Sequence, residues 1–268
     1  MVELMLKRGV ASGDSLRGSF PKSAPPVLEV NGWRVGRVEV PHFQLLPGEV
    51  VGLVGLTGAG HFGFARSLYT NMAVMAGEMV VDGQKVSRRN PRELQRLGVG
   101  FVPDSRMENA LTAEGTISEN LSLVHPEAGK SGGLLWPRLE GQESRRVMDQ
   151  LNIRATGPRQ TIKTLSGGNK QKASLGKWMY GATDRYKVLI FVEPTEGVDV
   201  GAKREIYGHI RQFSERGVAV IVATSDLLEV QQITHRVIPF VAGRPGPEIP
   251  AEDYSEQRFI DAMAGEAA

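Results

Sequence analysis

Short apolar runs alternate along the chain with amphipathic stretches. Continuous apolar runs occur at EVVGLVG (49–55), VGFV (99–102), KVLIFV (187–192), VAVIVAT (218–224) and RVIPFV (236–241). Runs of this length are typical of strands that are buried on both faces. Residues 202–217 instead place Ile206, Ile210 and Phe213 at helical spacing. Buried strands that alternate with helices predict an α/β fold with a mostly parallel sheet and helices on both faces.

Three other stretches depart from this pattern. VLEVNGW and RVEVPHFQL alternate polar and apolar residues, which predicts an antiparallel edge subdomain near residues 27–50. Residues 106–186 are mostly polar and helical, which predicts an inserted helical subdomain between core segments 27–105 and 187–268. Residues 1–26 are expected to form a tail or linker, because Gly, Ser and Pro follow eight residues that suit the end of a helix.

Composition narrows the function classes. Hydrophobic residues make up 41% of the 268 positions and charged residues 23%, which excludes a wholly disordered chain. Cysteine is absent, which excludes disulfides, thiol catalysis and cysteine-based zinc sites. The net charge of +2 gives no strong field for nucleic acid. No apolar run approaches the roughly 18 residues that a membrane-spanning helix needs. If the protein acts at a membrane, we expect it to do so through a partner protein.

A glycine-rich turn follows the first buried run and precedes a helical stretch. Its spacing matches the phosphate-binding pattern G-x-x-x-x-G-K-[ST], in which glycines let successive backbone N–H groups point at phosphate oxygens. The candidate phosphate-binding residues are Gly55, Gly58, Ala59, Gly60, His61 and Phe62. The loop alone also fits a plain glycine turn with no ligand.

The two chemically active positions of that pattern are substituted. His61 replaces the lysine, and a histidine is mostly neutral near pH 7. Phe62 replaces the Ser/Thr, so this position offers no oxygen to Mg²⁺, a cation that requires oxygen ligands. The sequence therefore predicts weak nucleotide binding that depends little on magnesium.

Two further motifs occur in order along the chain. LSGGNKQ (165–171) opens a helix, with Ser166 as a natural N-cap and two glycines that expose backbone N–H groups. The apolar run 187–192 ends in Glu193, a carboxylate placed where it can orient an attacking water. Its alternative role is to cap the turn that runs to Asp199.

In this order, the glycine loop, LSGGNKQK and EPTEGVDVGAKREIY resemble an ATP-binding-cassette (ABC) ATPase domain. They resemble most of all the C-terminal cassette of ribose/galactose/xylose-type sugar importers, whose ATPase carries two cassettes in one polypeptide. The resemblance covers roughly residues 27–245, and the opening MVELMLKRG resembles the last helix of a preceding cassette. It implies a P-loop NTPase fold and ATP as the ligand.

The resemblance also implies roles for individual residues. Two cassettes of this family pack head to tail, so that the signature of one closes over the nucleotide of the other. The positions implied on that interface are Ser166, Gly167, Gly168, Gln171 and Asp199, and those implied in catalysis are Glu193, Ser225 and Asp104.

Several of these positions depart from the family pattern. Val192 stands for the Walker B aspartate, Asp104 for a glutamine that contacts metal and water, and Ser225 for the γ-phosphate-sensing histidine. Together with Phe62 these changes predict that the chain's own site is impaired, with Mg²⁺ binding doubtful and Glu193 vestigial.

The function expected from the resemblance is therefore that of an ATP-binding subunit, or half-subunit, of an importer for sugars or related solutes. The implied partners are a second cassette, a membrane permease and, indirectly, a substrate-binding protein, at the inner face of the cell membrane. One alternative is a cassette that hydrolyses ATP at its own site, with His61 and Asp104 as substitutes. Another is an ABC ATPase outside transport.

The remaining residues of interest are expected to be structural. Arg88, Arg89, Arg92 and Arg96 suggest a solvated face rather than a nucleic-acid site, because an acidic residue interrupts the run. Trp33, Trp136 and Trp178 are expected to pack, although Trp33 has adenine stacking as an alternative. The histidines show no metal-ligand spacing, and no metal site is predicted.

Overall fold

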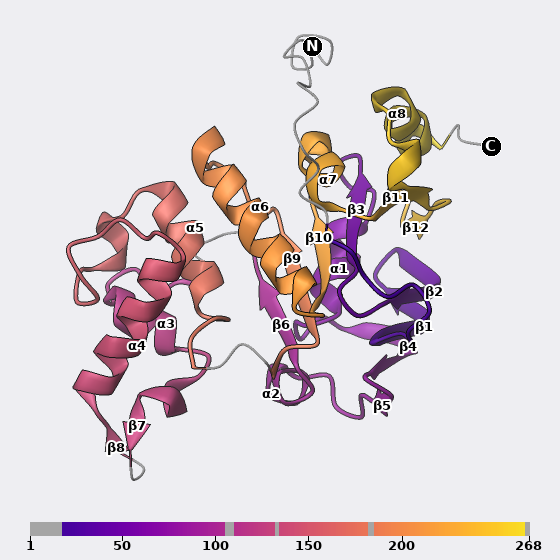
Figure 1. Ribbon diagram of the computed structural model, residues 1–268. Coiled ribbons are helices and arrows are strands. Elements are labelled where there is room, and N and C mark those ends of the chain that lie inside the picture. The colour runs from indigo at the N-terminus through magenta and orange to yellow at the C-terminus, as the bar shows by residue number, and fades with distance from the viewer. Residues whose placement is uncertain (1–17, 105–109, 132–133, 182–184, 266–268) are drawn as a thin grey trace.

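The structure is a computed structural model that describes residues 18–104, 110–131, 134–181 and 185–265 (Figure 1). The helix end predicted for the first eight residues lies outside these ranges. The strands are β1 (Leu28–Val35), β2 (Val38–Leu45), β3 (Val50–Gly55), β4 (Val74–Val81), β5 (Gln84–Lys85), β6 (Val99–Val102), β7 (Lys130–Ser131), β8 (Leu134–Leu135), β9 (Val188–Val192), β10 (Ala219–Ala223), β11 (Arg236–Val241), β12 (Arg244–Pro245) and β13 (Ile249–Pro250).

The described residues also form α-helices and 3-10 helices. The α-helices are α1 (His61–Ser67), α2 (Pro91–Arg96), α3 (Ile117–Ser122), α4 (Pro137–Gln150), α5 (Gly167–Gly176), α6 (Val200–Glu215), α7 (Leu227–Ile233) and α8 (Glu256–Ala264). The 3-10 helices are η2 (Pro126–Gly129), η3 (Ile162–Thr164) and η5 (Ala251–Asp253).

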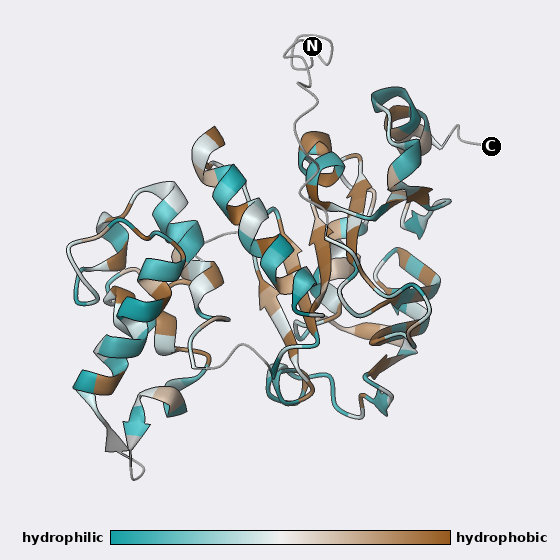
Figure 2. Cartoon of the chain, viewed as in Figure 1, coloured by the Kyte–Doolittle hydropathy of each residue, from teal (hydrophilic) through white to brown (hydrophobic). Residues whose placement is uncertain are grey.

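A mostly parallel sheet forms the centre of the molecule. Its strands follow the order β11-β3-β10-β9-β6 with parallel pairing, and β12 and β13 pair antiparallel with β11. Every residue of β6, β9 and β10 is buried, and Figure 2 shows these strands in the colour of hydrophobic residues. Burial on both faces explains why the sequence shows continuous apolar runs there. The predicted α/β fold is confirmed.

A second, antiparallel sheet has the order β2-β1-β4-β5. The strands predicted near residues 27–50 are present, but the sheet also takes in residues 74–85 as β4 and β5. The prediction missed β4 because its partner β1 lies some forty residues earlier in the chain. Trp33 on β1 is 1% exposed and donates its Nε1–H to Ser67 Oγ, 2.8 Å away on α1.

The two faces of the main sheet have different cover. On one face, alternate residues such as Val51 and Leu53 of β3 share a core cluster with Phe64 of α1 and with the antiparallel sheet. On the other face, Leu189 and Phe191 of β9 pack with α3, α4, α5 and α6. Helices α7 and α8 cover β3 and β11. Helix α1 is thus enclosed between two sheets, directly after the glycine-rich turn.

The segment 110–181 forms the helical lobe that Figure 1 shows beside the main sheet. Helix α3 begins with a capping box, in which Thr116 accepts from Glu119 N and the Glu119 carboxylate accepts from Thr116 N. Helix α6, which packs on β10, buries Ile206, Ile210 and Phe213 as its spacing predicts. The division of the chain into a core and an inserted subdomain stays a prediction.

All five parallel strands point the same way, so their carboxyl ends meet at one edge of the sheet. The glycine-rich turn follows β3, Asp104 follows β6, Glu193 follows β9 and Thr224 follows β10. This edge therefore gathers the chemistry that the sequence singles out.

Candidate functional site

The glycine-rich loop joins β3 to α1. Gly58 and Gly60 have φ angles of 82° and 107°, which side-chain-bearing residues rarely adopt. A Cβ at Gly55 would lie 2.9 Å from the Phe240 carbonyl oxygen, so this position also requires glycine. The loop is held from outside by Gly243, whose N–H donates to the Ala59 carbonyl at 2.8 Å. The sequence thus builds a tight and well-supported turn with its backbone exposed.

His61, the first residue of α1, is turned into this loop. It is 1% exposed, and a Cβ at Gly55 would lie 2.9 Å from its Nδ1. Neither ring nitrogen has a hydrogen-bond partner among the described residues. Burial, with a further contribution from the Arg66 cation, lowers the pKa of His61 to about 4. The imidazole is therefore neutral in the free chain at physiological pH.

Phe62 and Asp104 are both engaged with Arg66. The Phe62 ring lies 3.9 Å from the His61 ring, and the Arg66 guanidinium lies 5.7 Å from the Phe62 centroid. Arg66 also donates to Asp104 Oδ2 at 2.5 Å. Asp104 therefore pairs with a cation on α1, an interaction that the sequence did not reveal because the partners are 38 residues apart.

Glu193 is tied to the end of the neighbouring strand. Its Oε1 accepts from the Ser225 N–H at 2.8 Å, and its Oε2 accepts from Thr224 Oγ1 at 3.3 Å. The alternative in which this carboxylate caps its own turn is wrong, because both oxygens bond to residues after β10. Glu193 also has a φ of 47°, an uncommon backbone conformation for a residue with a side chain. Val192, just before it, is fully buried.

A second carboxyl group, that of Glu229, is buried below the carboxyl ends of the parallel strands. The sequence analysis did not predict it. Glu229 on α7 is fully buried, and burial raises its pKa to about 7, with smaller contributions from the Asp226 and Glu193 carboxylates. Asp226 caps α7 and accepts from Lys203 Nζ of α6 at 2.6 Å. A glutamate in an amphipathic helix looks ordinary in sequence, so no signal marked Glu229.

The LSGG segment begins helix α5. Ser166 is exposed and caps the helix, accepting from Asn169 N at 3.4 Å and from Asn169 Nδ2 at 2.9 Å. Asp199 caps α6 in the same way, accepting from Ala202 N at 3.0 Å. A Cβ at Gly168 would lie 3.0 Å from Ala202 Cβ, so this glycine lets α5 approach α6.

The signature surface is separate from the chain's own glycine loop. Helix α5 lies in the helical lobe, whereas α1 lies between the sheets (Figure 1). Gly167 and Gly168 open α5 next to Ser166, but Gln171 is 2% exposed and points into the interior. One chain therefore presents its two candidate phosphate-binding elements at different places.

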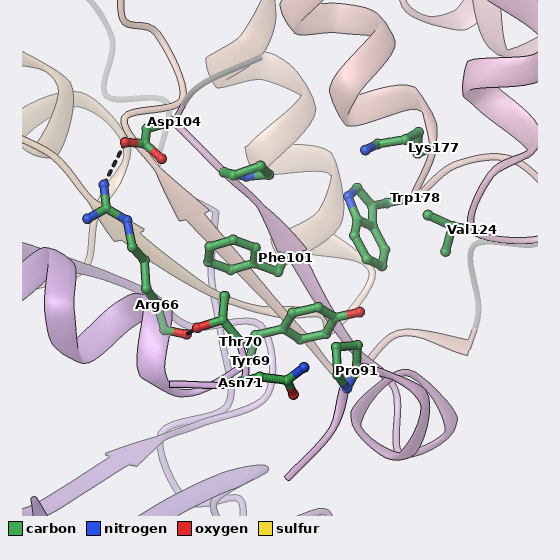
Figure 3. Close-up of a pocket in the computed structure, with 11 residues that line it drawn as sticks. Arg66, Tyr69, Thr70, Asn71, Pro91, Phe101, Asp104, Val124, Lys177 and Trp178 are labelled. Carbon is green, nitrogen blue, oxygen red and sulfur yellow. Dashed lines mark hydrogen bonds and ion pairs between the residues drawn. The ribbon is translucent and has the colours of Figure 1, made fainter. Parts of the chain in front are cut away.

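A pocket of about 560 Å³ lies between the core and the helical lobe (Figure 3). Its aromatic side chains come from β6 and from the segments that follow α1 and α5. Tyr69 stacks on Phe101 at 5.5 Å, and Trp178 meets the Tyr69 ring edge-on at 6.2 Å. The full lining is Arg66, Tyr69, Thr70, Asn71, Pro91, Phe101, Pro103, Asp104, Val124, Lys177 and Trp178. Lys177 donates to the Ala110 carbonyl, and burial lowers its pKa to about 8.

The structure shows whether the remaining arginine and tryptophan side chains are packed or exposed. Arg88, Arg92 and Arg96 are exposed, while Arg89 covers the Trp33 ring at 5.1 Å. That contact and the burial of Trp33 leave no ring face for adenine. Trp178 packs as expected, but Trp136 is 51% exposed, so the packing prediction is wrong there. His, Asp and Glu side chains form no group of three or more suited to a metal ion among the described residues.

Comparison with known proteins identifies the family. The family model for "ABC transporter" matches residues 38–196. The ribose import ATP-binding protein RbsA 1 of Streptomyces avermitilis is 36% identical over 253 residues, covering 92% of this chain and 48% of that protein. The arabinose import ATP-binding protein AraG of Rhizobium etli is 36% identical over 236 residues, covering 88% of this chain and 47% of that protein. The chain thus spans about half the length of these relatives.

Solved structures agree on the fold. The ADP conformation of MJ1267, an ATP-binding cassette of an ABC transporter, superposes with a TM-score of 0.71 at 15% identity, covering 90% of this chain and 96% of that one. A dimeric post-hydrolysis state of the cassette MJ0796 bound to ADP and Pi has a TM-score of 0.70 at 17% identity, covering 85% of this chain and all of that one. The order of the glycine loop, signature helix and Glu193 strand agrees with these matches, and the chain belongs to the ABC transporter family.

Proposed function

We propose that this chain is an ATP-binding cassette of an importer for sugars or related small solutes, with an impaired site of its own. The observation that carries the proposal is a contrast within one chain. The glycine loop has Phe62 at the position where the family pattern has a metal-binding hydroxyl, whereas the signature helix keeps an exposed, capping Ser166. Similarity to ribose and arabinose import ATP-binding proteins supports the class of solute.

The residues at the glycine loop do not fit Mg²⁺. This ion requires oxygen ligands in near-octahedral geometry. Phe62 and Val192 supply none, and the Asp104 carboxylate is paired with Arg66. Both Glu193 oxygens accept hydrogen bonds from Thr224 and Ser225. We therefore derive no hydrolytic step at this site.

The backbone of the loop is proposed to bind phosphate groups. Gly58 and Gly60 hold the positive φ angles that this tight turn requires. The Ala59 N–H donates to the Leu56 carbonyl at 2.9 Å, so other N–H groups of the loop would face the phosphates. ATP binding through the loop backbone is thus retained in the proposal, without the metal contribution. The loop is expected to serve as a structural or regulatory half of a two-cassette assembly.

The signature helix is proposed to complete the site of a partner cassette. Ser166 is exposed at the N-cap of α5 and Gly167 is partly exposed, whereas Gly168 is buried against α6. Backbone N–H groups at a helix N-terminus favour an anion such as a bound γ-phosphate. Asp199, which begins α6 close to Gly168, is proposed to carry the signal across the same interface.

The pocket in Figure 3 is proposed to receive a cytoplasmic segment of the permease. The pocket combines an aromatic surface with the charged side chains of Arg66, Asp104 and Lys177. Two exposed apolar residues are next to lining residues in sequence: Met72 follows Asn71, and Leu123 precedes Val124. Large apolar side chains that are exposed around a pocket mark interaction surfaces. No helix in the described part of the chain is long and apolar enough to cross a bilayer. We propose that the permease holds the chain at the inner face of the membrane.

Cross-linking tests this placement. A photo-reactive amino acid at Asn71, on the pocket, is expected to cross-link to an integral membrane protein in cells. The same group at Asp149, an exposed position at the end of α4, serves as the matched control and is expected to give no such product. Equal cross-linking from both positions, or none from Asn71, would contradict permease docking at this pocket.

The retained Glu193 favours one alternative function, a cassette that hydrolyses ATP at its own site. Measuring the ATPase rate of the purified chain with Mg²⁺ distinguishes this alternative from the proposed function. The proposal predicts no turnover above background, and the alternative predicts turnover that Glu193→Gln abolishes.

A further inference from the structure

The starting observation is an orphaned imidazole inside the glycine loop. His61 is 1% exposed, yet Nδ1 and Nε2 both lack a hydrogen-bond partner among the described residues. Buried polar atoms are almost always paired, so two unpaired nitrogens on one ring need an explanation. The ring is turned toward the loop backbone, since a Cβ at Gly55 would lie 2.9 Å from Nδ1. The ring thus lies against the loop that is proposed to hold phosphate groups.

We propose that the loop binds the polyphosphate of a nucleotide without magnesium, in a step that takes up one proton on His61. The inference rests on the proposed function, in which the chain's own site has no metal. The proton comes from solvent and adds to the free ring nitrogen, so that both ring nitrogens carry hydrogen. No covalent bond of the nucleotide changes.

The chemistry of the ring requires the proton. A neutral imidazole has one donor nitrogen and one acceptor nitrogen, whereas phosphate oxygens in a bound nucleotide only accept. A neutral His61 therefore leaves its acceptor nitrogen facing negative charge. Protonation turns that nitrogen into a second donor and replaces part of the charge that lysine and Mg²⁺ supply in the family pattern.

The surroundings of the ring decide when the proton binds. Arg66, one turn further along α1, is the charged group that acts on His61, and it disfavours protonation. Asp104 pairs with Arg66, and Glu193 is engaged by Ser225, so no described carboxylate stabilises the imidazolium. Burial of the ring is the main cause that lowers the pKa of His61 to about 4 in the free chain, and the Arg66 cation adds to it. Several negative charges of a polyphosphate beside the ring raise that pKa.

The sign of the pH dependence follows from linkage. The free chain carries a neutral His61 from about pH 5 upward, whereas the complex carries a protonated one up to its higher pKa. Binding therefore takes up a proton within that window, and affinity rises as pH falls. One proton limits the gain to about tenfold for each pH unit.

The test is calorimetric titration of the whole chain with ATP in the presence of EDTA, at about pH 8, 7 and 6 in two buffers that differ in ionisation enthalpy. His61→Gln is the matched control, because the γ-phosphate of ATP itself titrates near pH 6 and contributes equally to both proteins. From pH 8 to 6 we expect the affinity of the natural chain to rise roughly 10- to 100-fold relative to H61Q, with close to one extra proton taken up.

A second variant keeps the test decisive if H61Q does not fold. His61→Lys carries a permanent charge and is expected to bind ATP without EDTA sensitivity and without the extra pH slope. Inorganic tripolyphosphate, titrated in parallel, is expected to show the same extra pH slope as ATP, because the proton balances polyphosphate charge. A tripolyphosphate affinity without that slope relative to H61Q would overturn this role of His61.

Two results separate this inference from the proposed function. The same pH slope in the natural chain and in H61Q, or no ATP binding at any pH, would overturn proton uptake on His61 and leave the signature role untouched. Proton uptake together with strong tightening by Mg²⁺ would support His61 as the proton acceptor and defeat the metal-free site.

Discussion

The glycine loop and the signature segment are both glycine-rich turns that open a helix, but their side chains are arranged in opposite ways. Around the loop, Phe62 is half-buried and Asp104 is paired with Arg66, so the side chains are engaged within the chain. At the signature, Ser166 is exposed and its hydroxyl is already placed by Asn169. This difference is the basis of the proposal that the chain has lost chemistry at its own loop and keeps a signature for a partner cassette.

The largest expected effect is on the signature side. Ser166→Asp keeps an N-cap but places a carboxylate where a partner's γ-phosphate is proposed to lie. We expect the ATPase rate of the assembled transporter to fall about 100-fold or more, as when a donor to a developing negative charge is lost. Thermal denaturation of the isolated variant checks that the fold is unchanged.

The matched control lies in the glycine loop. His61→Gln in the same assembly is expected to lower the steady-state ATPase rate much less than S166D does, because turnover is proposed to occur at the partner's loop and His61 acts only on nucleotide binding at this one. Equal losses in S166D and H61Q would remove the contrast between the two elements.

The next effect concerns the buried acid beneath the strand ends. Glu229 has a folded-state pKa of about 7 against an ordinary value of 4.5, so the folded state holds its proton more tightly than the unfolded state. As pH rises from about 4.5 to 7, this residue costs stability, up to about 3 kcal/mol once it is ionised. Glu229→Gln is expected to be more stable than the natural chain at about pH 8, in urea unfolding.

His61 opposes Glu229 in the same titration. Its folded-state pKa is depressed to about 4, so its contribution to stability is lost as pH falls from about 6.5 to 4. The difference in unfolding free energy between the natural chain and E229Q reports the ionisation of Glu229 alone, because His61 is present in both proteins. A difference that does not vary with pH would show that Glu229 ionises freely.

The smallest expected effect comes from removing the ion pair between Asp104 and Arg66. Asp104→Asn removes the charge that pairs with Arg66, and because both side chains are partly exposed we expect a loss of only about 0.5–1 kcal/mol in unfolding free energy. Asp104→Gln restores the family residue, yet it is expected to leave nucleotide binding insensitive to Mg²⁺. Recovery of magnesium dependence in D104Q would show that Asp104 alone disables the site.

The sequence predicts the main sheet well because its signal is local. Each buried strand is a continuous apolar run, and the buried face of α6 follows from Ile206, Ile210 and Phe213. The antiparallel sheet was only partly predicted, since β1 pairs with β4 across a long stretch of chain. The burial of a strand can be predicted from its own residues, but the identity of the strand that pairs with it cannot.

The candidate site was predicted in its positions but not in its contacts. The spacing located the loop, the signature and Glu193. The bonds of Asp104 to Arg66 and of Glu193 to Ser225 join residues 38 and 32 positions apart, so only the fold reveals them. Trp136 was predicted wrongly from its residue type: a large aromatic side chain was expected to pack in the interior, but it is half exposed. Residue type sets what a side chain can do, and tertiary contacts decide what it does.

The most direct test of the account is a titration of the isolated chain with ATP, with and without Mg²⁺ at one pH. The account predicts weak binding whose dissociation constant changes by less than about threefold when magnesium is added, because Phe62 and Val192 offer the ion no oxygen. Binding that tightens about tenfold or more with magnesium would contradict the central claim that this loop has lost its metal site.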